Sequence, residues 1–184
     1  MNSSEDVTSA TVTMFTELQK LGVENFRCGI NHIKTDRTHE VWSITHSTEG
    51  QTVKAVGSFN IDAHPFWRSM YEAWIDKKDS FYGYLTGKEK KDYINILNAT
   101  PNYLSQPIRD FPDVYFHLYF FGEGTVWTMT FHPPSEDERQ IMKRFASVFS
   151  LTFSRYQDLK KTEAQAREAQ IQLALERVRA RMMA

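Results

Sequence analysis

The chain has 184 residues, of which 41% are hydrophobic, 24% charged and 14% aromatic, and its formal net charge is −1. This composition predicts one globular domain with at most an appendage, because disorder requires low hydrophobicity and a high net charge. The balanced charge excludes a global basic field, so we expect no nucleic-acid partner. No run of about 18 apolar residues occurs, so we expect no membrane contact from this segment.

Cysteine use indicates the compartment. Cys28 is the sole cysteine and has no partner for an intramolecular disulfide, and the N-terminus lacks a charged segment followed by an apolar one. We therefore expect a cytoplasmic protein. Cys28 lies in an apolar segment and is expected to be a buried, inert thiol.

A helix and a three-stranded meander are predicted first. The segment 7–21 has apolar residues at helical spacing and is followed by Gly22, a common residue after a helix end. The next segments, 26–33, 40–46 and 51–61, are rich in aromatic and β-branched residues and are separated by short polar stretches. This pattern is typical of antiparallel strands.

Two helices and a short aromatic run are predicted after the meander. Asp62 or a neighbour is expected to cap an amphipathic helix that carries aromatic residues on one side. The run 81–85 follows, and Thr86 with Glu89 forms a capping-box pattern that opens a second helix through Leu97. An ordered loop is then predicted by three prolines, Pro101, Pro107 and Pro112.

The last third of the domain is predicted to be a hairpin and a long helix. The strands 114–121 and 125–131 are joined by Gly122-Glu123-Gly124, a three-residue connection that predicts a hairpin. Ser135 and Glu138 repeat the capping-box pattern. No Gly or Pro follows, so one helix of about 50 residues, roughly 75 Å long, is allowed. Its end must leave a domain about 30–35 Å across.

The two halves of this helix differ in character. Residues 141–156 carry a wide apolar face, as a helix packed on a sheet does. Residues 158–184 are mainly Ala, Gln, Glu and Arg, and such a helix needs a partner for stability. We therefore divide the chain into a domain, 1–157, and the start of a coiled-coil linker helix, 158–184, which we expect to continue beyond the chain.

Two heptad frames fit the linker helix, and the sequence does not choose between them. We expect a homodimer through the first and last helices, in which a modest input shifts one frame toward the other. The alternative is a solvated terminal helix without a role. One frame contains Ala164, Ile171 and Val178 with Glu168, Leu175 and Met182, and the other contains Leu159, Ala166, Leu173 and Ala180.

The order of these elements resembles that of the GAF family of sensory domains. The segment from Ser135 to Phe149 looks like the last GAF helix, and Leu173 to Arg181 is similar to the signalling helices that precede histidine kinase or cyclase outputs in bacterial multidomain proteins. The resemblance implies an α+β fold, with an antiparallel sheet of five to six strands, helices on its faces and a long C-terminal helix that leaves the domain. No bilin-attaching cysteine and no N-K-F-D-E motif of cyclic-nucleotide binders is present, so the cofactor stays unidentified.

The sequence contains no nucleotide-binding or catalytic motif of a standard type, and we expect no enzyme activity from this chain. His32, His39 and His46 recur every seven residues, but strand alternation need not direct them to one face, and no cysteine is adjacent to them. We therefore expect no metal site. An alternative hypothesis is a small enzyme that uses His117, otherwise expected to be buried or to face the inserted helices, with Tyr115 or Tyr119 as acid–base groups.

Aromatic residues with polar tips gather on the predicted sheet and inserted helices, which enclose the ligand pocket in GAF-like domains. Such side chains can line an apolar cavity with a few convergent polar groups. Plain core packing is the alternative interpretation. The candidate pocket residues are Trp42, Phe59, Trp67, Tyr71, Trp74, Tyr82, Tyr115, His117, Tyr119 and Trp127.

The resemblance implies a sensory or regulatory module of a signal-transduction protein, as in two-component systems. We expect a small molecule or partner to bind between the sheet and residues 62–100, and the change to reach the helix 135–157, its tail and an effector outside this chain. One alternative is a ligand-free dimerisation scaffold, which a fully packed interior would favour. Another is a PAS-like sensor, whose helices would fall between the second and later strands.

Overall fold

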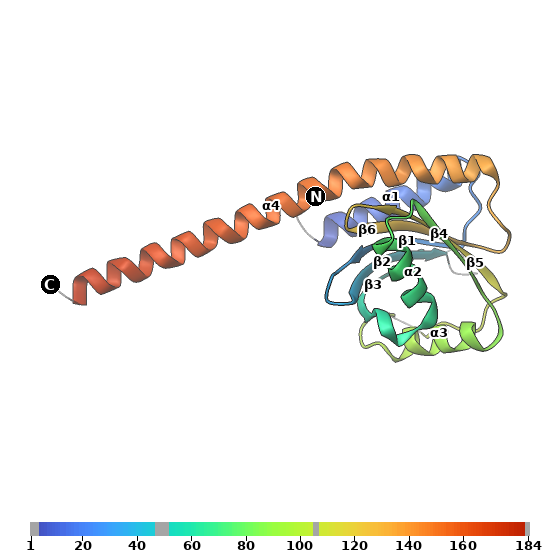
Figure 1. The fold of residues 1–184 in the computed structure, drawn as a ribbon, viewed down its shortest axis with the longest axis horizontal. Coiled ribbons are helices and arrows are strands. Elements are labelled where there is room, and N and C mark those ends of the chain that lie inside the picture. The colour runs from blue at the N-terminus through green and yellow to red at the C-terminus, as the bar shows by residue number, and fades with distance from the viewer. Residues whose placement is uncertain (1–3, 47–51, 105–106, 183–184) are drawn as a thin grey trace.

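A computed structural model describes residues 4–46, 52–104 and 107–182 (Figure 1). Six antiparallel strands form one sheet in the order β3-β2-β1-β6-β5-β4, which confirms the predicted α+β class. The predicted strands agree with the observed ones within two residues at each end, and the aromatic run 81–85 forms the edge strand β4. The strands are β1 (Arg27–Ile33), β2 (Thr38–His46), β3 (Thr52–Asn60), β4 (Ser80–Leu85), β5 (Val114–Phe121) and β6 (Gly124–Thr130).

Helices cover both faces of the sheet. Figure 1 shows α1 and α4 over one face and α2 and α3 over the other, and we call these the α1/α4 face and the α2/α3 face. Both inserted helices follow the three-stranded meander, an order compatible with a GAF-like fold. The helices are α1 (Ser4–Lys20), the short 3-10 helix η1 (Ile61–Ala63), α2 (Pro65–Ile75), α3 (Gly87–Ala99) and α4 (Glu136–Met182).

Strand alternation sends side chains of each central strand into two separate cores. On β1, Cys28 and Ile30 are fully buried in the core under α1 and α4. Asn31 and Ile33 of the same strand face α2, where Asn31 Nδ2 lies 3.9 Å from Met70 Sδ. The sheet is therefore the wall that the two cores share.

The two predicted capping boxes have different outcomes. At the start of α4 the prediction is confirmed, because Ser135 N donates to Glu138 Oε2 at 2.6 Å and Glu138 N donates to Ser135 Oγ at 3.2 Å. At the start of α3 it is wrong. Thr86 makes no side-chain cap bond there, and its hydroxyl donates instead to Asp113 at 2.6 Å. This bond ties the start of α3 to the segment that leads into β5.

One local prediction is made specific and another is corrected. The cap expected at Asp62 or a neighbour is His64, whose Nδ1 accepts from Phe66 N at 3.1 Å. The hairpin connection has two residues rather than three, because Phe121 pairs with Gly124. Gly124 must be glycine, since a Cβ there would lie 2.3 Å from the carbonyl oxygen of Asn31.

The helix α4 is uninterrupted over 47 residues. Met142, Ala146, Phe149 and Phe153 are buried against the sheet, together with side chains of α1. Every described side chain from Asp158 onward is exposed, and Figure 1 shows this part of the helix extending away from the domain. At 1.5 Å per residue, the exposed part is about 38 Å long.

Packing leaves no room for a side chain at Gly29 of β1, at the centre of the sheet. A Cβ there would lie 2.5 Å from the Trp127 ring and 2.5 Å from the carbonyl oxygen of Trp42. Because a backbone atom cannot yield, we expect Gly29→Ala to lower the free energy of unfolding by about 3 kcal/mol in urea denaturation. Gly22→Ala is the control: it meets no atom within 4 Å and costs about 1 kcal/mol through its positive φ. Equal losses in the two variants would contradict this packing account.

Candidate functional site

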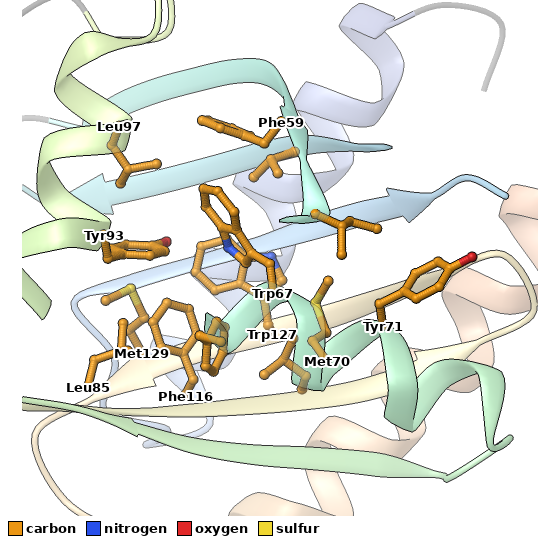
Figure 2. Close-up of a cluster of buried hydrophobic side chains, with 14 of the residues drawn as sticks. Phe59, Trp67, Met70, Tyr71, Leu85, Tyr93, Leu97, Phe116, Trp127 and Met129 are labelled. Atoms are coloured by element: carbon orange, nitrogen blue, oxygen red, sulfur yellow. The ribbon is translucent and has the colours of Figure 1, made fainter. Parts of the chain in front are cut away.

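An aromatic cluster fills the space between the sheet and the helices α2 and α3. Trp67 of α2 lies with its ring centre 5.1 Å from that of Phe59 and 5.6 Å from that of Tyr93. On the sheet, Phe116 and Trp127 have ring centres 5.6 Å apart. Figure 2 shows the Trp67 ring at the centre of this cluster, with Trp127 beneath it.

A small cavity lies inside this cluster, between the sheet and the segment in which the sequence predicts a binding region. Its volume is about 20 Å³. A cavity of this size has room for about one water molecule and for no larger ligand. Binding of a small molecule would therefore require the walls to move. The lining residues are Asn31, His39, Val41, Phe59, Phe66, Trp67, Tyr93, Leu97, Tyr103, Phe116, Leu118 and Trp127.

Two polar side chains of the sheet form part of the cavity wall. Asn31 Oδ1 accepts a hydrogen bond from Trp127 Nε1 at 2.8 Å. His39 is fully buried, and neither of its ring nitrogens has a hydrogen-bond partner. Burial lowers the pKa of His39 to about 3, so the ring is neutral at pH 7. A neutral imidazole offers one donor and one acceptor to whatever enters the cavity.

A buried arginine adjoins the cavity. Arg27 of β1 is 2% exposed, and its Nη2 donates to Tyr103 Oη at 2.5 Å and to Ser43 Oγ at 3.0 Å. Its Nε has no hydrogen-bond partner. Its guanidinium carbon lies 5.8 Å from the ring centre of Tyr103 and 5.9 Å from that of Trp127, both of which line the cavity. Within the described residues, no carboxylate forms an ion pair with Arg27.

Tyr103 closes the cavity from the segment between α3 and β5. Its ring lies against Gly57, where a Cβ would come within 2.6 Å of Tyr103 Cδ2, and its ring centre is 4.8 Å from that of Phe59. The far part of the same segment is fixed to α3, since Asn98 exchanges two hydrogen bonds with the backbone of Ile108. Tyr103 itself belongs to no helix or strand of the sheet.

The structure divides the ten candidate pocket residues between the two faces of the sheet. Phe59, Trp67 and Trp127 line the cavity. Tyr71 belongs to the same buried cluster and Trp74 packs against it, but neither lines the cavity, and Figure 2 shows the Tyr71 hydroxyl directed away from Trp67. Five lie on or beside the α1/α4 face and cannot reach the cavity: Trp42, Tyr82, Tyr115, His117 and Tyr119.

His117 and its aromatic neighbours form a second polar group beside α4. The His117 ring is stacked with that of Tyr115 at 6.3 Å, and its Nε2 lies 3.0 Å from Thr130 Oγ1. Burial lowers the pKa of His117 to about 4. Arg139 of α4 lies with its guanidinium carbon 5.7 Å from the Tyr82 ring centre. His117 therefore faces α4 and not the inserted helices.

The recurring histidines do not converge. His32 lies on the α1/α4 face, with its ring centre 5.1 Å from that of Phe153, whereas His39 lies in the opposite core. The side chain of His46 is outside the described residues. Across the described chain, no group of three or more His, Cys, Asp or Glu side chains is placed to hold a metal ion.

Sequence reasoning missed the polar groups nearest the cavity. These are Arg27, Asn31, Ser43 and Tyr103, none of which belongs to a recognised motif. Strand alternation offered one signal, since Arg27, Asn31 and Trp127 face the same side once β1 and β6 are paired.

Comparisons with known proteins find no matching family model, no matching curated protein and no matching solved structure. None of the described helices combines the length and apolar character that a membrane span requires.

The buried histidines predict a specific pH dependence of stability. The folded-state pKa values of His39 and His117 lie below the ordinary value of 6.5, so the unfolded chain binds protons more readily. Stability is then present above pH 6.5 and is lost as the pH falls toward 4. Between pH 6.5 and 4.5, each residue should remove on the order of 2 kcal/mol from the free energy of unfolding.

Urea denaturation across this pH range measures the effect. His39→Phe should abolish about half of the loss, because the substituted side chain does not titrate. Ile44→Val is the control, since it trims a fully buried side chain of the other core without adding or removing a titratable group, and it should leave the slope unchanged. An unchanged slope in the His39→Phe variant would show that His39 is not buried in its neutral form.

Proposed function

We propose that this chain is a GAF-like sensory module that binds a small molecule on the α2/α3 face and relays the change through α4 to an effector. The observation that carries the proposal is the continuity of α4. Its first half belongs to the domain core, through Met142, Phe149 and Phe153, and its second half is exposed. A displacement of the first half is therefore transmitted along one rigid element. The cysteine use of the sequence supports a cytoplasmic location for such a module.

The input side of the proposal rests on the enclosed cavity. Aromatic walls with a few convergent polar groups are typical of small-molecule sites. His39 and Arg27 both carry buried nitrogen atoms without hydrogen-bond partners. A ligand could satisfy these groups, because polar atoms buried without partners cost free energy.

The central strands provide the mechanical link. Trp127 of β6 faces the cavity, whereas the adjacent Val126 is buried in the core that α4 covers. On β5, Phe121 has its ring centre 5.7 Å from that of Phe153 of α4. A shift of these strands on ligand entry would change the packing surface under α4.

The tail supports a homodimeric output. Ile171, Leu175 and Val178 belong to one heptad frame and share one side of the helix, and each is about half exposed. A single helix with sparse apolar residues is marginal in water, and a parallel copy would bury the same stripe. The two heptad frames would then correspond to two signalling states.

Cysteine cross-linking of the tail tests the relay. Single cysteines at Ile171 and Leu175 report one frame, and cysteines at Ala166 and Leu173 report the other. We expect dimeric disulfides whose yield favours one pair of positions, and a shift toward the other pair when the bound molecule is removed. The native Cys28 contributes no background, because it is fully buried and burial raises the pKa of its thiol.

Native mass spectrometry at several concentrations, before and after denaturation, identifies the oligomer and any retained molecule. A dimer with extra mass that denaturation releases supports the sensory module. A strict monomer at high concentration would contradict the dimeric relay.

A ligand-free dimerisation scaffold is the second candidate function. The small volume of the cavity, about 20 Å³, favours it, because the interior is already almost completely packed. The two candidates differ in the cross-linking experiment. A scaffold gives a single frame that no small molecule changes.

A further inference from the structure

We propose that Arg27, Ser43 and Tyr103 form a closed recognition site for a small monocarboxylate with an aromatic or aliphatic body. In this structure the site is closed, and the hydroxyl of Tyr103 occupies the place that a carboxylate oxygen of the ligand would take. The proposed function is needed only for the further step in which binding at this site changes α4 and produces a signal. The binding site itself follows from the residues around Arg27.

Arg27 is buried without a charged partner among the described residues. Its side chain is 2% exposed, and the groups that accept its hydrogen bonds are two neutral hydroxyls, those of Ser43 and Tyr103. An arginine removed from water without an opposite charge is destabilising. Cation–π contacts with Tyr103 and Trp127 offset only part of this cost. The site is therefore arranged for an anion.

The donors of the Arg27 guanidinium have the shape that a carboxylate requires. A guanidinium presents five N–H groups in a planar fork that matches a carboxylate with two parallel hydrogen bonds. Nη2 of Arg27 is bonded to the two hydroxyls, whereas the buried Nε has no partner. Ser43 would remain as a third donor to the same carboxylate.

Tyr103 stands between the cavity and Arg27, and its movement would let a ligand enter. The Tyr103 ring lines the cavity and its hydroxyl reaches the guanidinium, so moving this one side chain joins the cavity to Arg27. Tyr103 lies in a connecting segment and not in an element of the sheet or a helix. The volume it would vacate is that of a phenol ring, which sets the size of the ligand body.

The charge of the ligand follows from the surrounding walls. The described cavity lining contains no lysine and no arginine, and its histidine, His39, is neutral. Arg27 is thus the one cation that borders the cavity among the described residues. One positive charge in apolar surroundings matches a monoanion, whereas a phosphate dianion would need further cations.

Binding of acids and of their uncharged amides tests the proposal. Phenylacetate, benzoate and hexanoate are titrated against the full chain, each beside its amide, with thermal stability and tryptophan fluorescence as readouts. We expect at least one acid to bind about tenfold more tightly than its amide. In Arg27→Gln this preference should fall below about twofold.

Two variants of Tyr103 sharpen the test. Tyr103→Ala removes the side chain that fills the site, so the preferred acid should bind more tightly than to the native chain. Tyr103→Phe is the matched control, since it retains the ring and so leaves the site filled. If none of the three acids binds the Tyr103→Ala protein in preference to its amide, or if the preference survives in Arg27→Gln, the proposal is wrong.

The stability of Arg27→Met separates recognition from a structural role. Ser43 Oγ and Tyr103 Oη lie 3.1 Å apart and keep each other as partners when the guanidinium is absent. If Arg27 serves recognition, its replacement should not reduce the stability of the fold. The melting temperature of Arg27→Met should therefore be equal to or higher than that of the native chain. A marked decrease would make Arg27 a structural residue and would overturn the proposal.

The outcomes distinguish this site from the proposed relay. If an acid binds through Arg27 but the tail cross-links do not change, the carboxylate site stands and the relay fails. If a different retained molecule shifts the tail and Arg27→Gln still binds it, the relay stands and the carboxylate site is wrong.

Discussion

The structure depends on one constraint, which is that a single sheet must supply a wall to two cores. Each residue of β6 is buried, and alternate side chains of this strand enter the opposite faces. Backbone hydrogen bonds hold β1 and β6 in register, so neither core can be repacked without moving strands that the other core contacts. This sharing is the physical basis for linking a cavity on the α2/α3 face to a helix on the α1/α4 face.

On both faces of the sheet, buried side chains carry nitrogen or oxygen atoms without a hydrogen-bond partner. His39 and Arg27 lie at the cavity, and His117, Tyr119 and Arg139 lie where α4 begins to cross the sheet. A core selected for stability alone would avoid such groups, because each costs free energy that apolar packing would not. Such groups lie on both faces of the sheet, as expected for a domain with two packing states of similar free energy.

Local patterns predicted the elements well because the relevant physics is local. Alternation and turn residues located the strands, and the Ser135 box located the start of α4. The Thr86 box failed because a distant carboxylate, Asp113, competes for the hydroxyl. The pocket residues could not be assigned from sequence alone, since the pairing of strands and the packing of helices decide which face lines a cavity. Tyr103 illustrates the limit, since it lies in a proline-rich loop and contacts Arg27 across 76 positions.

Methyl NMR of the methionines measures the coupling between the two cores directly and without a ligand. Met70 and Met129 report the α2/α3 face, and Met14 and Met142 report the α1/α4 face. Opening the site with Tyr103→Ala should shift the resonances of Met142 as well as those of the near pair. Shifts confined to Met70 and Met129 would show that the sheet insulates the two cores, and the relay through α4 would then be contradicted.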